Sequence, residues 1–108
     1  MISFLFNRRE NKICGFTVCG HAMFAESGQD IVCASVSSAV MLTANLLTEN
    51  FNVQSDVKAD ENRITVSVTD NREEYLDVAD KLLCGLAQHV EMVSEEFEGC
   101  IKTEYSEV

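Results

Sequence analysis

The sequence predicts an α+β fold, a ββαββα(β) two-layer sandwich with a mostly antiparallel sheet packed against two helices. Two observations predict it. Short apolar segments with period-two alternation occur in two pairs, and a segment of helical length follows each pair. The 108 residues contain no proline, repeat or low-complexity tract, so we expect residues 1–108 to form a single domain.

The first pair of strands lies at the N-terminus. Ile2–Phe6 and Ile13–Cys19 alternate as strands on either side of a polar turn, which predicts a hairpin. We expect Cys14, Phe16 and Val18 to share one face of the second strand.

The next segment, Asp30–Leu47, is apolar almost all round and too long for an ordinary strand, so we expect a buried helix. Asp30 is a candidate N-cap, which would place Cys33 in the first turn. Serine, threonine and asparagine residues interrupt the segment, and we predict that it does not span a membrane.

The second half repeats the pattern. Val53–Val57 and Ile64–Val68 predict a second hairpin, and Asp70 followed by Glu73 resembles a capping box that opens a long amphipathic helix. Residues Cys100–Tyr105 are a candidate final strand. The expected apolar stripe of the helix is Tyr75, Ala79, Leu82, Leu86, Val90, Val93 and Phe97.

Acidic residues dominate the charge. There are 18 Asp and Glu against 8 Lys and Arg, a net charge of −10, and residues 51–108 hold −9 of it. This balance argues against binding nucleic acid through a basic face. It leaves open a solvated acidic face or a surface that attracts basic partners. No signal peptide is evident, so we expect a cytoplasmic protein.

A cysteine and a histidine form the candidate reactive pair. Five cysteines without regular spacing do not indicate a disulfide framework, and the default interpretation of each is a small buried hydrophobe. His21 follows a strand and Cys33 begins a helix, where unpaired N–H groups would favour a thiolate and a nearby imidazole would take its proton. By residue type alone, a cysteine in an apolar helix, such as Cys33, is more often a core residue than a nucleophile. A histidine at the end of a strand, such as His21, is more often a hydrogen-bonded edge residue.

Neighbouring residues allow other arrangements. Asp30 is placed either to orient His21 or to cap the helix, and Ser37 lies one turn after Cys33. A zinc site of Cys19, His21 and Cys33 would have three ligands at most, so we predict no metal and no cofactor.

The motif as a whole resembles a known family. Gly20-His21-Ala22, then Gly28-x-Asp30-Ile-Val-Cys33-Ala-x-Val-Ser37, resembles the ribosomal-processing cysteine proteases, known as Prp or YsxB-like. The resemblance implies that Cys33 is the nucleophile and His21 the general base of a Cys-His dyad. The supporting or substrate-loop positions would be Gly20, Ala22, Met23, Phe24, Gly28, Asp30 and Ser37.

The resemblance also implies an activity. It would be a cysteine endopeptidase that acts through an acyl-enzyme on a basic ribosomal protein, the large-subunit protein numbered twenty-seven. The enzyme would remove the N-terminal extension of that protein by cutting after paired aromatic residues, and it would be a homodimer. The alternative is a non-catalytic acidic module that binds basic ribosomal proteins.

Overall fold

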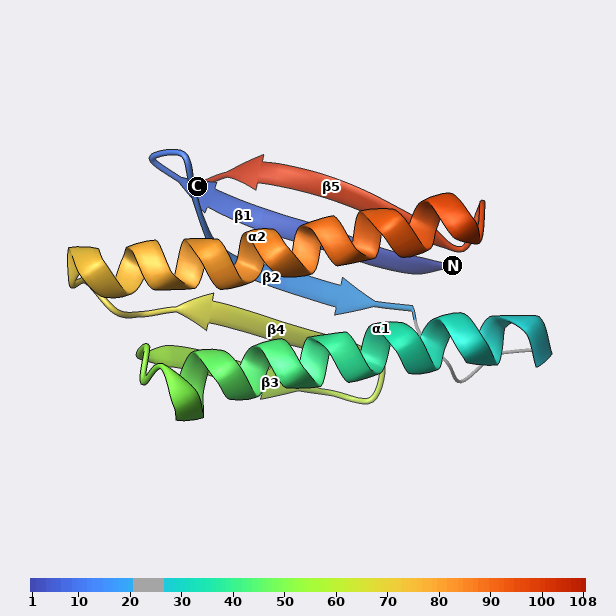
Figure 1. Cartoon of the computed structure of the whole chain (residues 1–108), viewed down its shortest axis with the longest axis horizontal. Coiled ribbons are helices and arrows are strands. Elements are labelled where there is room, and N and C mark those ends of the chain that lie inside the picture. Colours follow the sequence, from blue (N-terminus) through green and yellow to red (C-terminus); the bar gives the residue numbers. More distant parts are fainter. Residues whose placement is uncertain (21–26) are drawn as a thin grey trace.

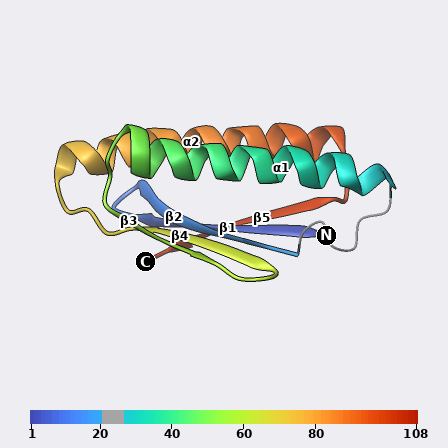
Figure 2. The same ribbon diagram turned by 90° about the horizontal axis from the view of Figure 1, so that it is seen from below.

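A five-stranded sheet and two long helices make up the two layers of the molecule (Figures 1 and 2). The structure is a computed structural model that describes the backbone of residues 1–20 and 27–108 and the side chains of residues 1–20 and 31–108. The elements are β1 (Ile2–Arg9), β2 (Lys12–Cys19), α1 (Ser27–Asn45), the π-helix η2 (Leu46–Asn50), β3 (Ser55–Ala59), β4 (Arg63–Val68), α2 (Glu73–Glu96) and β5 (Ile101–Glu107). This order confirms the predicted ββαββα(β) sandwich.

The strands are ordered β3-β4-β2-β1-β5 across the sheet. Three of the four pairings are antiparallel, and β5 adds a parallel pair on the outer edge of β1. The β1–β2 turn consists of Glu10 and Asn11, whose φ angles of 53° and 68° give the two-residue turn that matches the twist of a hairpin. The sheet is therefore mixed but mostly antiparallel, as predicted.

Aromatic side chains from the central strands form the middle of the core. Phe4, Phe6 and Phe16 are almost fully buried, and their ring centroids lie 5.5 to 6.2 Å apart. They project from the face of the sheet that α1 and α2 cover, and no described element covers the opposite face (Figure 2).

The predicted face of β2 is wrong at one position. Asn7 pairs with Gly15 and Arg8 pairs with Ile13, so Cys14 is the extra residue of a β-bulge. The bulge shifts the alternation, and Ile13 rather than Cys14 joins Phe16 in the core. The half-buried Cys14 thiol instead lies 3.5 Å from the carbonyl oxygen of Asn7.

Helix α1 is buried on one side only, so the prediction of a buried helix was wrong for the other side. Its inner side includes Val32, Val36 and Val40 in the core, whereas Met41 and Leu42 on its outer side are 62% and 60% exposed. The sequence misled because the outer side has no charged stripe to mark it. Ile31–Asn50 is apolar and long enough to cross a membrane, a property shared by core helices of soluble proteins, and 33% of that window is buried here.

Helix α2 follows the predicted stripe, with Ala79, Leu86, Val90 and Val93 buried. The main difference is Leu83, which is fully buried whereas the predicted Leu82 is only partly buried.

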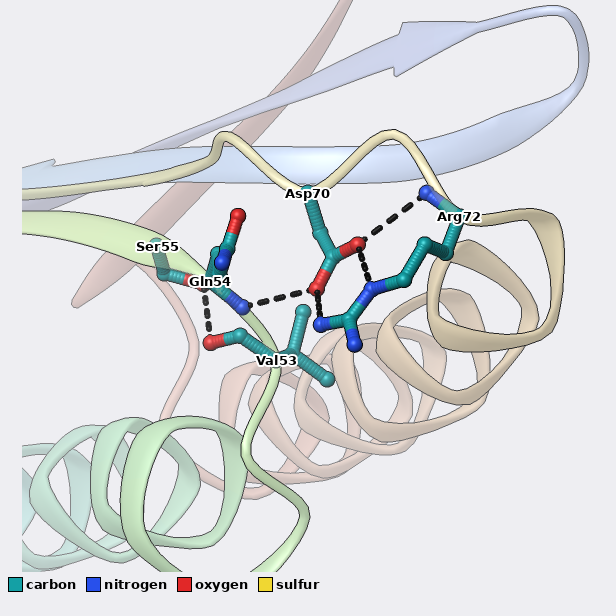
Figure 3. A network of polar contacts seen from close by, with 5 residues as sticks. All are labelled: Val53, Gln54, Ser55, Asp70 and Arg72. Carbon is teal, nitrogen blue, oxygen red and sulfur yellow. Dashed lines mark hydrogen bonds and ion pairs between the residues drawn. The ribbon is translucent and has the colours of Figure 1, made fainter.

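The predicted capping box at the start of α2 is not formed. The N-cap is Arg72, without a side-chain cap, and Asp70 lies two residues before it. The Asp70 carboxylate accepts hydrogen bonds from the backbone N–H groups of Gln54 and Arg72 (Figure 3). It also accepts two hydrogen bonds from the Arg72 guanidinium, from Nε at 2.8 Å and from Nη2 at 2.6 Å. The guanidinium in particular holds the pKa of the Asp70 carboxyl well below its ordinary 3.8, although burial opposes this shift. Asp70 therefore ties the approach to β3 to the start of α2.

Candidate functional site

The end of β2 and the start of α1 lie at the same end of the molecule, next to the N-terminus (Figures 1 and 2). β2 ends at Cys19 and α1 begins at Ser27. Four predicted site residues, His21, Ala22, Met23 and Phe24, lie outside the described residues. The distance between the Cys33 sulfur and the His21 ring therefore stays a prediction.

Gly20 occupies a position that only glycine fits. Its φ angle is +76°, and a Cβ built on it would lie 2.5 Å from the carbonyl oxygen of Met1. Its N–H donates a 3.3 Å hydrogen bond to the carbonyl oxygen of Asn62 in the β3–β4 turn. Two segments far apart in sequence thus hold the backbone at Gly20, one residue before His21 in the sequence.

Met1 and Asn62 are neighbours of the site that the sequence analysis missed. The peptide groups of both residues make the contacts, and a backbone contact leaves no signal in the type of side chain. The N–H of Ile2 donates a 2.8 Å hydrogen bond to the carbonyl oxygen of Cys100, which holds the N-terminal strand against the start of β5. The contacts of Met1 and Asn62 with Gly20 follow from the pairing of β2 with β1 and β4, so they could be predicted only once the order of the strands was known.

Cys33 lies on the inner side of α1. It is 6% exposed and belongs to the same core cluster as Val32 and Val36. The side chain is therefore directed toward the sheet layer, from which β2 also leads to His21. Ser37, one turn further along α1, is half-buried.

The predicted position of Cys33 in the first turn is wrong. α1 begins at Ser27, so Asp30 lies within the helix rather than capping it, and Cys33 is in the second turn. Gly28 and Asp30 are both in the first turn, where backbone N–H groups have no partner within the helix.

This earlier start changes the electrostatics around Cys33. The partial positive charge of a helix start falls off within the first turn, so it acts mainly on residues 27–30 and less on the sulfur in the second turn. The same four N–H groups are those available to a ligand or to a negatively charged oxygen. A thiolate at Cys33 would thus depend on His21 more than a thiolate in the first turn would.

The other cysteines differ from Cys33 in their surroundings. Cys84 on α2 is half-buried, and its thiol lies 3.4 Å from the Asp80 carboxylate. Burial, with the adjacent carboxylate, raises the pKa of the Cys84 thiol, which keeps it protonated and poorly nucleophilic. Cys19 is half-buried at the end of β2 and pairs with Ser3.

Among the residues whose side chains the structure describes, no three His, Cys, Asp or Glu residues are grouped so as to hold a metal ion. The possible zinc site of Cys19, His21 and Cys33 includes a residue outside this set.

Comparison with known proteins gives a family match over nearly the whole chain. The model of a family described as cysteine protease Prp matches residues 1–102. No curated protein matches the chain in sequence.

Several solved structures share the fold. SMU.848 from Streptococcus mutans has a TM-score of 0.89 at 22% identity, over 100% of this chain and 96% of that one. An essential ribosomal processing protease Prp from S. aureus, in complex with a substrate peptide, has a TM-score of 0.85 at 21% identity, over 98% and 100%. The same protease with a covalently linked product peptide gives 0.83 at 22% identity, also over 98% and 100%. At these identities the likeness establishes a common architecture.

Proposed function

Because the chain belongs to the family of the cysteine protease Prp, we propose that it is an endopeptidase that removes the N-terminal extension of a large-subunit ribosomal protein. Membership in the family makes it a cysteine peptidase. The finer proposal is that the substrate is the protein numbered twenty-seven, cut after paired aromatic residues in the cytoplasm. Supporting it, the S. aureus protein of the same fold is a ribosomal processing protease that was crystallised with a substrate peptide.

The proposed reaction uses Cys33 and His21 as a dyad. The Cys33 thiolate attacks the scissile carbonyl carbon, and protonated His21 gives its proton to the leaving amine, so that a thioester forms as the peptide bond breaks. Neutral His21 then takes a proton from water as the water attacks the thioester. This releases the acid product and restores the Cys33 thiolate beside protonated His21.

The negatively charged oxygen of each tetrahedral intermediate needs hydrogen-bond donors. The unpaired backbone N–H groups of residues 27–30 at the start of α1 are the candidates, because donors fixed in a helix need no reorganisation during the reaction. They lie within two turns of Cys33 along the same helix. Because α1 begins at Ser27, the N–H groups of residues 31–33 can bond within the helix and are not among the candidates.

The observation that carries the proposal is the position of Cys33. It is on the buried side of α1, at the end of the molecule where the Gly20 turn leads the chain into His21. A cysteine with only a structural role would need neither the turn at Gly20 nor a histidine directly after that glycine. The excess of acidic residues, 18 against 8 basic ones, also suits a basic ribosomal substrate.

We further propose that the enzyme is a homodimer, with no nucleic acid or membrane as partner.

The test is cleavage of a synthetic peptide that carries an aromatic pair within a basic sequence, with the products identified by mass spectrometry. The wild-type protein should cut after the pair, and it should not cut a control peptide in which alanines replace the pair. Cys33→Ala and His21→Ala should each abolish product.

Two results would contradict the proposal. Cleavage at the wild-type rate by Cys33→Ala would exclude the dyad. Tight binding of the basic peptide with no cleavage under any condition would favour the alternative, a non-catalytic acidic module.

A further inference from the structure

The strand β5 has an open edge, because it is last in the strand order and no described strand lies beyond it (Figure 1). The carbonyl oxygen of Cys100 faces β1, where it accepts the N–H of Ile2 at 2.8 Å. The next carbonyl, of Ile101, faces the other way, and the Ser94 hydroxyl of α2 lies 3.5 Å from it. Peptide groups of a strand point to its two sides in turn. The residues of β5 that direct both N–H and C=O to the open edge beyond Ile101 are therefore Thr103, Tyr105 and Glu107.

A trough between α2 and β5 lies beside this edge. It consists of two adjoining hollows of about 290 and 250 Å³, which share Ala87, Glu91 and Tyr105 in their walls. The Tyr105 ring lies 5.6 Å from the ring of Phe6, on the face of the sheet that the helices cover, and 46% of Tyr105 is exposed. An extended chain that paired with β5 would direct every second side chain toward this trough.

The surroundings of the trough are acidic. Residues 91–108 contain six acids and one base, which is half of the net charge of −10. Arg8 also lines the trough, but its guanidinium bonds to Glu107 at 2.8 Å. Glu91 is exposed and makes no ion pair with a described residue. A cationic side chain in the trough would therefore meet an available carboxylate.

The other edge of the sheet lacks this charge. Ser55–Ala59 of β3 contain one acid and one base, Asp56 and Lys58, which lie 3.8 Å apart. The two edges offer similar peptide groups, but only β5 adds an excess of acids to them.

Charge decides between the possible occupants of the β5 edge. A second copy that paired with β5 through its own β5 would bring the six acids of each chain together. Nucleic acid and anionic lipid would be repelled by the same acids. An extended peptide rich in lysine or arginine satisfies both the peptide groups and the carboxylates.

The edge begins at the same end of the molecule as the proposed active site. Ile101 pairs with Ile2, and Gly20 approaches the carbonyl of Met1, so the start of β5 and the end of β2 lie on either side of β1. Two strand spacings, about 10 Å, separate them. An extended chain of about three residues spans that distance.

We propose that the open edge of β5 binds a basic segment of the substrate as an added strand, with a lysine or arginine of that segment against Glu91. The segment is the part of the basic protein that follows the cut. The inference rests on the proposed peptidase function and adds a second binding surface outside the dyad. Because this surface does not contact the reacting atoms, it should lower KM and leave kcat unchanged.

The test compares two synthetic substrates that share the aromatic pair. The short peptide ends about three residues after the cut, and the long peptide continues with a lysine-rich segment of about seven residues, the length of β5. The wild-type protein should have a KM about tenfold lower for the long peptide, because that peptide alone can form the added strand.

Thr103→Pro tests the strand pairing. Proline removes the N–H that faces the open edge and leaves the peptide groups that bond to β1 in place. It should raise KM for the long peptide by about fivefold and leave KM for the short peptide unchanged. The matched control is Val57→Pro on β3. The N–H of Asp60 donates to the carbonyl oxygen of Arg63 across the β3–β4 pair, so by alternation the N–H of Val57 faces the other open edge. This control should leave both KM values unchanged.

Glu91→Lys tests the charge without altering a strand. Glu91 is exposed on α2, so the variant should fold, which thermal unfolding checks for all four variants. It should raise KM for the long peptide by about threefold. Glu49→Lys makes the same change of charge at an exposed residue of η2, which lies over the β3 side of the sheet, and it should have a smaller effect.

The outcomes separate this surface from the peptidase function. Equal KM values for the two peptides in the wild-type protein would overturn the added strand. So would Thr103→Pro and Glu91→Lys variants that raise KM for the long peptide no more than their controls do, or that raise KM for both peptides alike. In each of these cases, cleavage of the short peptide leaves the peptidase proposal standing. If neither peptide is cleaved, that proposal fails, and fluorescence anisotropy of the labelled long peptide decides the surface by the same comparison of variants.

Discussion

The two helices cover the same face of the sheet, and each carries a cysteine, but they are held there by different interactions. α2 has polar anchors: the Asp80 carboxylate accepts the N–H of Ile13 at 2.8 Å, and Asp77 lies 2.6 Å from Lys12. On α1, the hydroxyl of Thr43 bonds within its own helix, and apolar burial on the inner side provides the packing. We infer that charged residues hold α2 in place on the sheet, whereas α1 carries the thiol that we propose to be reactive.

The two cysteines sharpen this comparison and should give the largest difference in activity. Cys33→Ala should lower kcat/KM for the aromatic-pair peptide by at least about 10³-fold, because the nucleophile is lost. Cys84→Ala should leave kcat/KM unchanged, since the raised pKa keeps that thiol protonated. Steady-state cleavage of both variants measures this, and equal losses would contradict the assignment of chemistry to α1 alone.

Substitution of Gly20 should give the next largest loss of cleavage, with Gly85 as the control. Gly20→Ala should lower kcat/KM by about 10- to 100-fold, since the strained φ and the clash with the Met1 carbonyl displace His21. It should also destabilise the protein by about 1–3 kcal/mol. The control, Gly85→Ala on α2, should stabilise it by up to about 1 kcal/mol without loss of cleavage. Denaturant unfolding and cleavage rates test both, and an unaffected Gly20→Ala would show that the turn does not position the dyad.

The acids of α2 should affect cleavage only several-fold, and through long-range attraction. Raising the ionic strength should lower kcat/KM for a basic substrate, because salt screens that attraction. Glu95→Gln/Glu96→Gln, at the end of α2 near the start of α1, should flatten the salt profile. The control pair Glu73→Gln/Glu74→Gln lies at the opposite end and should flatten it less. A salt-independent rate in the wild-type protein would remove the electrostatic contribution.

Asp70 should matter least for cleavage and most for the stability of α2. Asp70→Asn weakens the contact with Arg72 at the end of the molecule opposite to Cys33, so the melting temperature should fall more than for the exposed Asp56→Asn. The pKa of Asp70 is lowered by folding, so its stabilising effect is complete above the ordinary value of 3.8 and is lost as the pH falls below it. The difference in melting temperature between the wild type and Asp70→Asn should therefore become smaller below about pH 4. A difference that stays constant with pH would contradict this role.

How far the sequence predicts the structure depends on the kind of interaction. Alternation predicted the strands and helical periodicity predicted α2, because burial on one face imposes these periods. The helix α1 was predicted from its length and apolar composition instead, and the π-helix η2 at its end was not predicted. The bulge at Cys14 and the exposed side of α1 were not predictable, since the first depends on strand pairing and the second on what lies beside the helix. At the candidate site, the motif predicted roles for Cys33 and Gly20, but the contacts of Met1 and Asn62 with Gly20 arise only in the folded sheet.

The central claim is that the sulfur of Cys33 is held as an anion by the imidazole of His21, and the reactivity of that sulfur tests it most directly. The native protein is treated with iodoacetamide at pH 6, and alkylation of each cysteine is followed by peptide mass spectrometry. Cys33 should react at least about 10-fold faster than Cys84, and His21→Ala should remove the difference. A Cys33 that reacts no faster than Cys84, with or without His21, would contradict it.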